Sequence, residues 1–227
     1  MVTRTPLYCR PSAFSLFTAQ LPRLDTVDGL VTAAVAVSLH ELGDADPLAV
    51  HDEIRTIGAT IRDRVQSDQK SAILAHLHDM LFEEMGFMGN HEDYYNPENS
   101  YLPWVLEHRR GLPITLTLIY KAVAEQVGLS VRGINTPWHF MAAVEIDGQM
   151  MFVDPFDAGR ALNREEVFAR IENTVGISVP PDDRLLAPAT HGQWITRIIQ
   201  NLIHVFGAAQ RRNDLAAMIE LQALLET

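Results

Sequence analysis

The chain has 227 residues but only one cysteine, Cys9, so it cannot form an internal disulfide. A protein without disulfides is typical of a reducing compartment, and we expect this one to be cytoplasmic. Basic residues are also scarce, since 18 lysines and arginines stand against 29 aspartates and glutamates and leave a net charge of −11. Nucleic acids and anionic membranes require a basic face, so this charge argues against both as partners.

Long apolar segments are missing as well. The N-terminal sequence MVTRTPLYCRPSAFSLF is interrupted by Pro6 and Pro11 and is too short in apolar length for a cleaved signal peptide. No stretch reaches the roughly 20 apolar residues of a transmembrane helix. The composition, 47% hydrophobic and 21% charged, is that of a globular protein, and the length favours one domain with a small appendage.

Metal-ligating patterns are scarce too. His76 and His78 are two positions apart within a predicted helix, where their side chains point to different sides. The acidic residues around Asp93 do not have the spacing of an EF-type calcium loop. We therefore expect neither a metal nor a cofactor.

The first ninety residues are predicted to be mainly helical. Apolar residues recur at spacings of three and four, which marks one buried helix face, at Ile54, Ile57, Ile61 and Val65. The pattern continues from Ile73 to Leu81 and ends before Gly86, a helix-ending glycine, and residues 27–42 form an earlier helix. These helices carry core residues and no recognisable chemistry.

The C-terminal part is predicted to be a helical hairpin. Residues 193–206 and 213–226 are both amphipathic and are joined by a short polar turn, like one tetratricopeptide unit. One such unit cannot bury its own apolar face, so we expect the hairpin to pack on the main domain rather than to form a repeat array. The Pro/Asp-rich segment 180–188 is the predicted linker, which divides the chain into residues 1–180 and 189–227.

The periodicity changes between these helical parts. Pro113 suits the first turn of a helix that we expect to run to about Val127. Asp147-Gly148 is a strong hairpin signal between two of the predicted strands. The strands are predicted at residues 131–135, 138–146 and 149–154.

The hairpin turn predicts which side chains meet. In a two-residue turn Ile146 lies opposite Gln149, and counting back along both strands makes His139 and Asp154 diagonal neighbours on one face. Such neighbours have Cα atoms about 7–8 Å apart, which an imidazole and a carboxylate can bridge. An aspartate that accepts from one ring nitrogen fixes the tautomer of a catalytic histidine, although the same bond can simply close a hairpin.

The loop before the central helix has the densest polar cluster of the sequence, NHEDYYNPENS at residues 90–100. In one interpretation it is structural, since Asp, Asn and Pro build turns and cap a following helix. In the other it frames, together with two arginines, a pocket beside His139 for a peptide or small ligand. We expect both roles, with one arginine buried against Glu92 or Asp93. The candidate binding residues are Asn90, Glu92, Asp93, Tyr94, Arg109, Arg110 and Trp138.

Four segments, GFMGNHEDYYNPENSYL, RRGLPITLTLIY, PWHF and VDPFDAGR, resemble the SirB-type bacterial branch of the transglutaminase-like superfamily. The resemblance covers roughly residues 20–175, and the C-terminal hairpin is similar to the repeat-like tail of that branch. It implies an α+β fold with a transglutaminase-like (papain-like) core, in which a helix packs on a small antiparallel sheet, with a helical N-terminal part and a C-terminal helical hairpin.

The resemblance also implies a catalytic cysteine at the start of the central helix, where the helix dipole and a histidine favour a thiolate. In this chain that position falls in Gly111–Thr115 and is best matched by Pro113, which has no nucleophile. The nearest hydroxyls belong to Thr115 and Thr117. The SirB-type branch itself lacks the cysteine, as far as the resemblance informs this.

Three functions are compatible with these residues. The first is a non-catalytic protein whose remnant His139–Asp154 groove binds a protein or peptide, in a regulatory role. The alternative is an acyl-transfer or amide-hydrolysing enzyme that uses Thr115 with His139 and Asp154, which requires the Thr115 hydroxyl within hydrogen-bond reach of the imidazole. The third is a structural scaffold, with the groove filled by side chains such as Trp138 or Tyr94.

Overall fold

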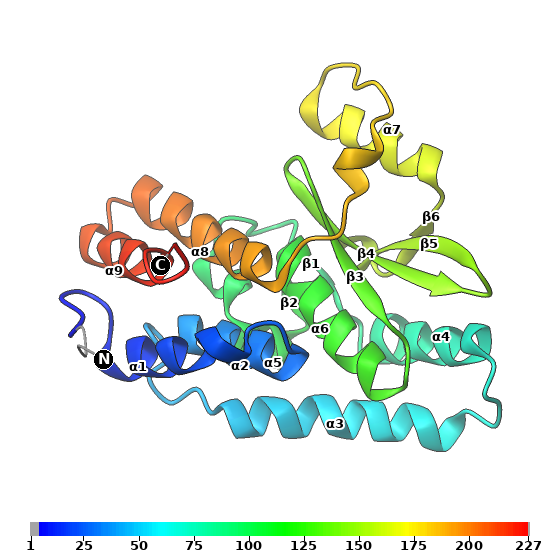
Figure 1. Cartoon of the computed structure of the whole chain (residues 1–227), viewed down its shortest axis with the longest axis horizontal. Helices are drawn as coiled ribbons and strands as arrows, with labels where there is room; N and C mark the ends of the chain where they lie inside the picture. The colour runs from blue at the N-terminus through cyan, green and yellow to red at the C-terminus, as the bar shows by residue number, and fades with distance from the viewer. Residues whose placement is uncertain (1–4, 227) are drawn as a thin grey trace.

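The computed structural model describes residues 5–226 and combines nine α-helices with two small sheets over that range. The helices are α1 (Pro11–Gln20), α2 (Val27–Ser38), α3 (Pro47–Arg64), α4 (Lys70–His78), α5 (Leu102–His108), α6 (Pro113–Gln126), α7 (Arg164–Val175), α8 (His191–Ala208) and α9 (Arg212–Gln222). The strands are β1 (Met88–Gly89), β2 (Arg110–Gly111), β3 (Val131–Thr136), β4 (His139–Ile146), β5 (Gln149–Asp154) and β6 (Arg160–Leu162). Helices and the antiparallel sheet occupy separate parts of the chain (Figure 1), which confirms the predicted α+β class.

The main sheet is fully antiparallel, in the order β3-β4-β5-β6. Asp147 and Gly148 both have positive φ, 51° and 78°, as the predicted two-residue turn requires. Ile146 lies opposite Gln149, so the predicted register of the hairpin is confirmed. The three predicted strands differ from the observed ones by a single residue at one end of β3 and of β4.

Helix α6 lies at the centre of the molecule. Every residue from Pro113 to Ala124 is buried, because the helix is enclosed by α3, β3 and β4. The sequence predicted only one buried side, but this helix is apolar around nearly its whole circumference, as expected of a fully enclosed helix. Its one buried cation, Lys121, donates to the carbonyl of Val131 at 2.7 Å and pairs with Glu125.

The N-terminal helices follow the predicted pattern with two differences, the first of which is that the helix predicted at residues 27–42 ends at Ser38. Ile54, Ile57 and Ile61 of α3 are buried as expected. The helix predicted to run from Ile73 to Gly86 is instead α4 followed by a π-helical turn, Asp79–Glu84. The wider turn rotates three consecutive side chains into the core, those of Met80, Leu81 and Phe82.

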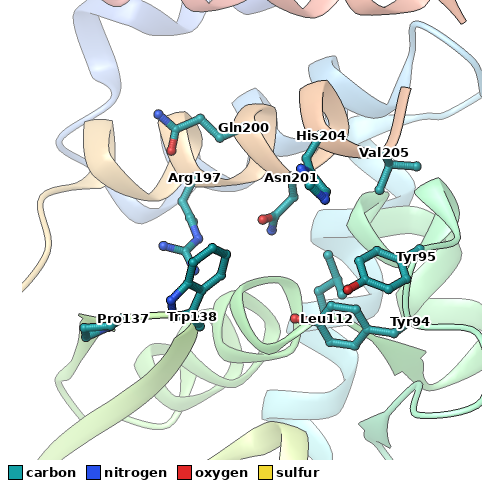
Figure 2. Close-up of a pocket in the computed structure, with 10 residues that line it drawn as sticks. All are labelled: Tyr94, Tyr95, Leu112, Pro137, Trp138, Arg197, Gln200, Asn201, His204 and Val205. Atoms are coloured by element: carbon teal, nitrogen blue, oxygen red, sulfur yellow. The ribbon is translucent and has the colours of Figure 1, made fainter. Parts of the chain in front are cut away.

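The C-terminal hairpin of α8 and α9 packs on α2 and α6 through α8 and reaches the sheet through the side chain of Trp194. Trp194 of α8 is fully buried, and its ring centroid lies 4.6 Å from that of Phe140 in β4. Gly133 of β3 leaves room for this indole, since a Cβ there would lie 2.1 Å from it. Another side of α8 carries Arg197 and faces the turn before β4 (Figure 2). The division into residues 1–180 and 189–227 stays a prediction.

Helix α9 is also attached to the start of the described chain. The carboxylate of Glu220 accepts hydrogen bonds from the backbone amides of Leu7 and Cys9, both at 2.8 Å, and from that of Tyr8. Segments more than 200 residues apart in sequence therefore lie side by side. Within residues 5–226, no helix combines the length and the apolar character needed to cross a membrane.

Candidate functional site

The predicted contact between His139 and Asp154 is confirmed. His139 is the first residue of β4, and its Nε2 lies 2.8 Å from Oδ2 of Asp154, the last residue of β5. Trp138, just before β4, has a φ of 60°, which allows the chain to turn tightly into the strand. The hydroxyl of Thr136 donates to the His139 carbonyl at 3.2 Å and closes this turn. The imidazole is thus held at the sheet end by backbone geometry and by Asp154.

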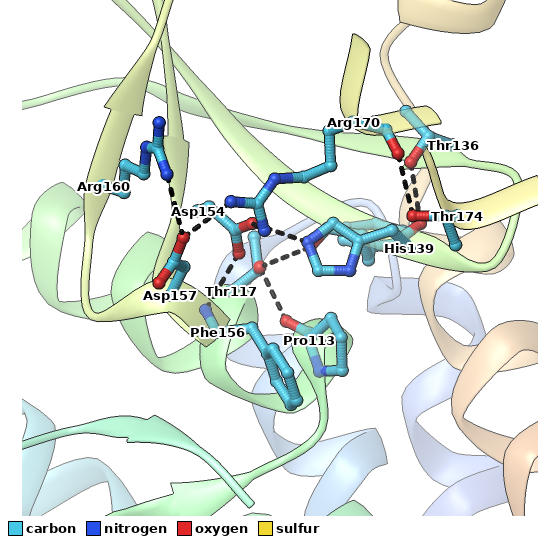
Figure 3. A network of polar contacts seen from close by, with 11 residues as sticks. Pro113, Thr117, Thr136, His139, Asp154, Phe156, Asp157, Arg160, Arg170 and Thr174 are labelled. Atoms are coloured by element: carbon cyan, nitrogen blue, oxygen red, sulfur yellow. Dashed lines mark hydrogen bonds and ion pairs between the residues drawn. The ribbon is translucent and has the colours of Figure 1, made fainter. Parts of the chain in front are cut away.

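Asp154 is fully buried and accepts from three donors (Figure 3). Besides His139, Nη1 of Arg170 donates at 2.6 Å and the Phe156 amide at 3.1 Å. Burial alone would raise the pKa of Asp154, but the hydrogen bond and charge of His139, the charge of Arg170 and the Phe156 amide lower it below its ordinary value. Nη2 of Arg170 also binds Asp157 at 2.6 Å. His139, Asp154 and Arg170 form the His–Asp–Arg cluster.

The third member of the cluster, Arg170, lies on α7 and was not predicted from the sequence. The capping box of Asn163 and Glu166 fixes the start of this helix. Val167 and Ile171 are buried, so residue 170 lies at the edge of the buried stripe. An arginine in that position was the only local signal.

A pocket of about 440 Å³ lies beside the cluster, between α8 and the loop of residues 94–95. Figure 2 shows Arg197 extending from α8 toward Trp138, with Tyr94 and Tyr95 across the opening. This α8 pocket is lined by Tyr94, Tyr95, Leu112, Pro137, Trp138, Arg197, Gln200, Asn201, His204 and Val205. Tyr94 and Trp138 were predicted as binding residues. The α8 residues were missed, although their spacing of three and four places them on one side of the helix.

Aromatic packing connects the loop to the cluster. The Phe156 ring lies 6.0 Å from the His139 ring, 4.5 Å from that of His91 and 5.9 Å from that of Tyr94, between centroids. Gly89 lets the loop approach, since a Cβ there would lie 2.5 Å from the Phe156 ring. Phe156 therefore positions Tyr94 relative to His139.

Most of the predicted polar loop residues build the loop itself. Nδ2 of Asn90 donates to Asn99 Oδ1 at 2.9 Å, and Asn90 Oδ1 accepts from the Asp93 amide at 3.1 Å. The side chain of Asn99 is buried and donates to the Asp93 carbonyl at 2.6 Å. Glu92 is exposed and does not line the α8 pocket. These contacts match the structural interpretation of the loop.

The expectation for the two arginines was wrong. Arg109 pairs with Glu53 of α3 at 3.0 Å and lies over the Phe87 ring, while Arg110 donates to the carbonyl of Gly86 at 2.7 Å. Neither contacts Glu92 or Asp93, and neither lines the α8 pocket. Arg109 ends α5 with a φ of 61°, and its side chain joins α5 to α3, which the sequence pattern could not show.

Comparison with known proteins identifies the family. A family model described as the transglutaminase-like superfamily matches residues 48–200, more than half of the chain. The chain belongs to the transglutaminase-like superfamily. The match extends from α3 into α8, so it includes the His–Asp–Arg cluster and part of the α8 pocket.

Curated relatives in this superfamily include bacterial proteins. A UPF0162 protein of Xylella fastidiosa (strain 9a5c) is 34% identical over 197 residues, which cover 83% of this chain and 70% of the relative. A UPF0162 protein of Haemophilus influenzae is 32% identical over 97 residues, 43% of this chain and 36% of the relative. F-box only protein 21 of Homo sapiens is 31% identical over 111 residues, 45% of this chain and 18% of the relative. No solved structure matches the chain significantly.

These relatives confirm the predicted bacterial branch of the transglutaminase-like superfamily. The SirB-type name and the repeat-like character of the tail stay predictions.

The position that the superfamily resemblance gives to a cysteine holds Pro113, the first residue of α6. Its carbonyl accepts from the Thr117 hydroxyl at 2.7 Å, and the same hydroxyl lies 3.4 Å from the carbonyl of Phe140, next to His139. The start of α6 is therefore held against β4 at the His–Asp–Arg cluster, as Figure 3 shows. Thr115 is fully buried, and its hydroxyl makes no hydrogen bond within the described part of the chain.

The chain's one thiol lies elsewhere. Cys9 is buried near α9, and its amide is bound to Glu220. Burial, reinforced by the charge of Glu220, raises the pKa of Cys9 to about 12, so it stays a protonated thiol at neutral pH. Among residues 5–226, no group of three or more His, Cys, Asp or Glu side chains is arranged to hold a metal ion.

Proposed function

We propose that this chain is a non-catalytic member of the transglutaminase-like superfamily that binds a protein or peptide segment in the α8 pocket. The observation that carries the proposal is a His–Asp–Arg cluster next to Pro113, which stands where the superfamily resemblance implies a cysteine, with a pocket lined by exposed aromatic side chains nearby. In this function, His139 and Asp154 do not line the pocket but hold the end of the sheet next to Trp138, and they do not activate a nucleophile.

The contacts of the nearby hydroxyls support the loss of catalysis. A threonine nucleophile must donate its proton to a base within hydrogen-bond reach. Thr115 Oγ1 is buried without a partner, and Thr117 Oγ1 is bound to a backbone carbonyl. No observation favours the alternative enzyme that uses Thr115.

The exposure of the aromatic residues supports binding. Trp138 is 71% exposed and Tyr94 is 37% exposed, so neither is buried in the groove as the structural scaffold would require. Large aromatic side chains at the mouth of a pocket are the residues that contribute most to protein interfaces, because they bury much apolar area with few rotamers to restrict. Leu112 and Val205 add an apolar surface within the same pocket.

Retention of peptides on the immobilised protein tests this function. The probe is a pool of N-acetylated, C-amidated pentapeptides of random sequence, quantified by mass spectrometry before and after elution. We expect peptides to be retained intact, and Trp138→Ala to lower retention about tenfold, the effect of a binding hot spot. Ile219→Ala, which removes an exposed apolar side chain of α9 outside the pocket, is the control.

Two results would contradict the proposal. Retention no better than on a blank surface would exclude peptide binding. Cleaved or transferred products that depend on His139 would instead establish an enzyme.

A further inference from the structure

The α8 pocket has a charge opposite to that of the whole protein. The chain carries a net charge of −11, yet none of the ten residues that line this pocket is acidic. The lining instead provides one guanidinium, from Arg197, and the amide side chains of Gln200 and Asn201. A pocket of this composition in an acidic protein attracts an anionic group and disfavours cationic ones.

Arg197 differs from the other half-buried arginines of the described chain. Arg109, Arg170 and Arg211 each pair with a carboxylate, and Arg110 donates to two backbone carbonyls. Arg197 instead makes a long hydrogen bond, 3.4 Å from Nη1 to Asn135 Oδ1. Burial also lowers the pKa of Arg197, which is the effect of enclosing a guanidinium without a counterion.

Nearby carboxylates do not fill this role. Asp93 and Glu98 flank the two tyrosines in sequence, but both accept hydrogen bonds from Nδ2 of Asn96, at 3.0 and 3.3 Å. Neither lines the pocket. The donors of Arg197 that point away from Asn135 are therefore open to a carboxylate from another molecule.

Resting on the peptide-binding function above, we propose that Arg197 binds the side-chain carboxylate of an acidic residue in an extended peptide. A guanidinium binds a carboxylate through two parallel hydrogen bonds. Asn201 is one helical turn from Arg197 and supplies an amide for the peptide backbone. An apolar residue beside the acidic one packs against Trp138 and Tyr95. The ligand class is thus an acidic peptide with an adjacent apolar side chain.

Matched peptide pools test this proposal. The first pool has N-acetylated, C-amidated pentapeptides with a central glutamate and random neighbours, and the second has glutamine at the centre. A third is the glutamine pool with a free C-terminal carboxylate. We expect the glutamate pool to be retained about tenfold better than the glutamine pool at low salt, since a charge-assisted pair contributes more than a neutral hydrogen bond.

Two variants with the same change of charge locate the effect. Arg197→Gln should abolish the preference for glutamate but retain the glutamine pool as the wild type does, which shows that the pocket is intact. Arg212→Gln is the control, because this exposed arginine lies in the same hairpin outside the pocket, and it should keep the full preference.

The possible failures are distinguishable. If no pool is retained, the peptide-binding function itself is wrong. If Trp138→Ala lowers retention but the glutamate and glutamine pools are retained equally well, only the role of Arg197 is wrong. The same conclusion follows if Arg212→Gln has the same effect as Arg197→Gln. A preference for the third pool would show that the pocket takes a C-terminal carboxylate and would overturn the side-chain assignment.

Discussion

Pro113 favours the start of helix α6, and its side chain provides no nucleophile at the position where the superfamily resemblance implies a cysteine. Leu112, the N-cap of α6, makes no side-chain cap, so the fixed φ of a proline at the first helical residue helps the helix to start. The same ring supplies neither a thiol nor an N–H to the space beside His139. A single substitution can therefore show whether the surrounding groups can still activate a nucleophile.

We expect Pro113→Cys to create a reactive thiol. A cysteine at a helix N-terminus near a histidine has its pKa lowered from about 8.5 to between about 3.5 and 7.5. The measurement is the rate of alkylation by iodoacetamide from pH 5 to pH 10, with the modified residue identified by mass spectrometry. The midpoint of the profile should lie below pH 7.

The double variant Pro113→Cys/His139→Gln provides the comparison, and its midpoint should move toward pH 8.5. The wild type measures the background of Cys9, which is buried and should react slowly. A midpoint near pH 8.5 in both variants would mean that His139 cannot influence a group at position 113.

For individual residues, the sequence predicts side-chain contacts within one hairpin but not side-chain contacts between separate helices and strands. His139 and Asp154 are related by the two-residue turn, so their contact follows from counting. Arg170 reaches Asp154 from α7, whose placement depends on packing that no local pattern encodes. Arg109 was misassigned for the same reason, since its partner Glu53 lies on α3.

For whole helices, too, the sequence predicts the faces of one helix but not what each face packs against. The sequence predicted the helices of the hairpin and the apolar stripe of α8, because periodicity defines the faces of one element. It did not indicate that the neighbouring stripe, with Arg197 and Asn201, forms a pocket wall rather than a solvated surface. Its position at the pocket depends on the packing of α8 on α2 and α6 and on the contact of Trp194 with β3 and β4.

The contact between α4 and α6 predicts a pH dependence of stability. Nε2 of His78 lies 2.9 Å from the Tyr120 hydroxyl, and burial lowers the pKa of His78 to about 4. The unfolded chain, with a pKa near 6.5, binds this proton more readily than the folded one. The neutral, buried His78 therefore makes its full contribution to the free energy of unfolding above about pH 6.5. As the pH falls from there to about 4, the free energy of unfolding decreases by about 3 kcal/mol.

Urea unfolding between pH 4 and pH 7 measures this loss. We expect His78→Gln to flatten the pH dependence over that window, while His108→Gln, a change of an exposed side chain, should leave it unchanged. A variant as pH-sensitive as the wild type would show that His78 is not the titrating group.

Within residues 5–226, the larger hydrophobic core includes residues of α1–α6, of strands β3–β5 and of α8 and α9, while a second, smaller cluster packs α7 on the sheet. Polar contacts add to this continuity. His40, just after α2, binds Asp214 of α9 at 3.0 Å, and Arg211 binds both Asp214, at 2.8 Å, and Glu41. We therefore expect the N-terminal helices, the sheet and the C-terminal hairpin to unfold together.

Gly133→Ala tests this coupling. The added Cβ would lie within 3 Å of both Trp194 and Phe140, two rigid rings, so we expect a loss of about 1–3 kcal/mol in the free energy of unfolding. In a Trp104→Phe/Trp138→Phe background, which leaves Trp194 as the one tryptophan, urea titrations followed by circular dichroism and by tryptophan fluorescence should give coincident curves. Gly207→Ala is the control, since its Cβ meets no atom within 4 Å, and it should not destabilise the protein.

Separate transitions would contradict this expectation. If fluorescence of the hairpin tryptophan changed before the helical signal of the rest, residues 189–227 would be an independent unit. Such a result would support the predicted division of the chain at residues 180–188.

The attachment of residues 7–9 to Glu220 has a consequence for connectivity. Because residues 7–9 are bound to α9, a short flexible linker could join the end of α9 to residue 5 and keep these contacts. The chain could then be opened at residues 180–182, between α7 and the following turn, without cutting a helix or strand. Such a circular permutant would keep every contact described above, so this fold does not require its elements to be synthesised in their present order.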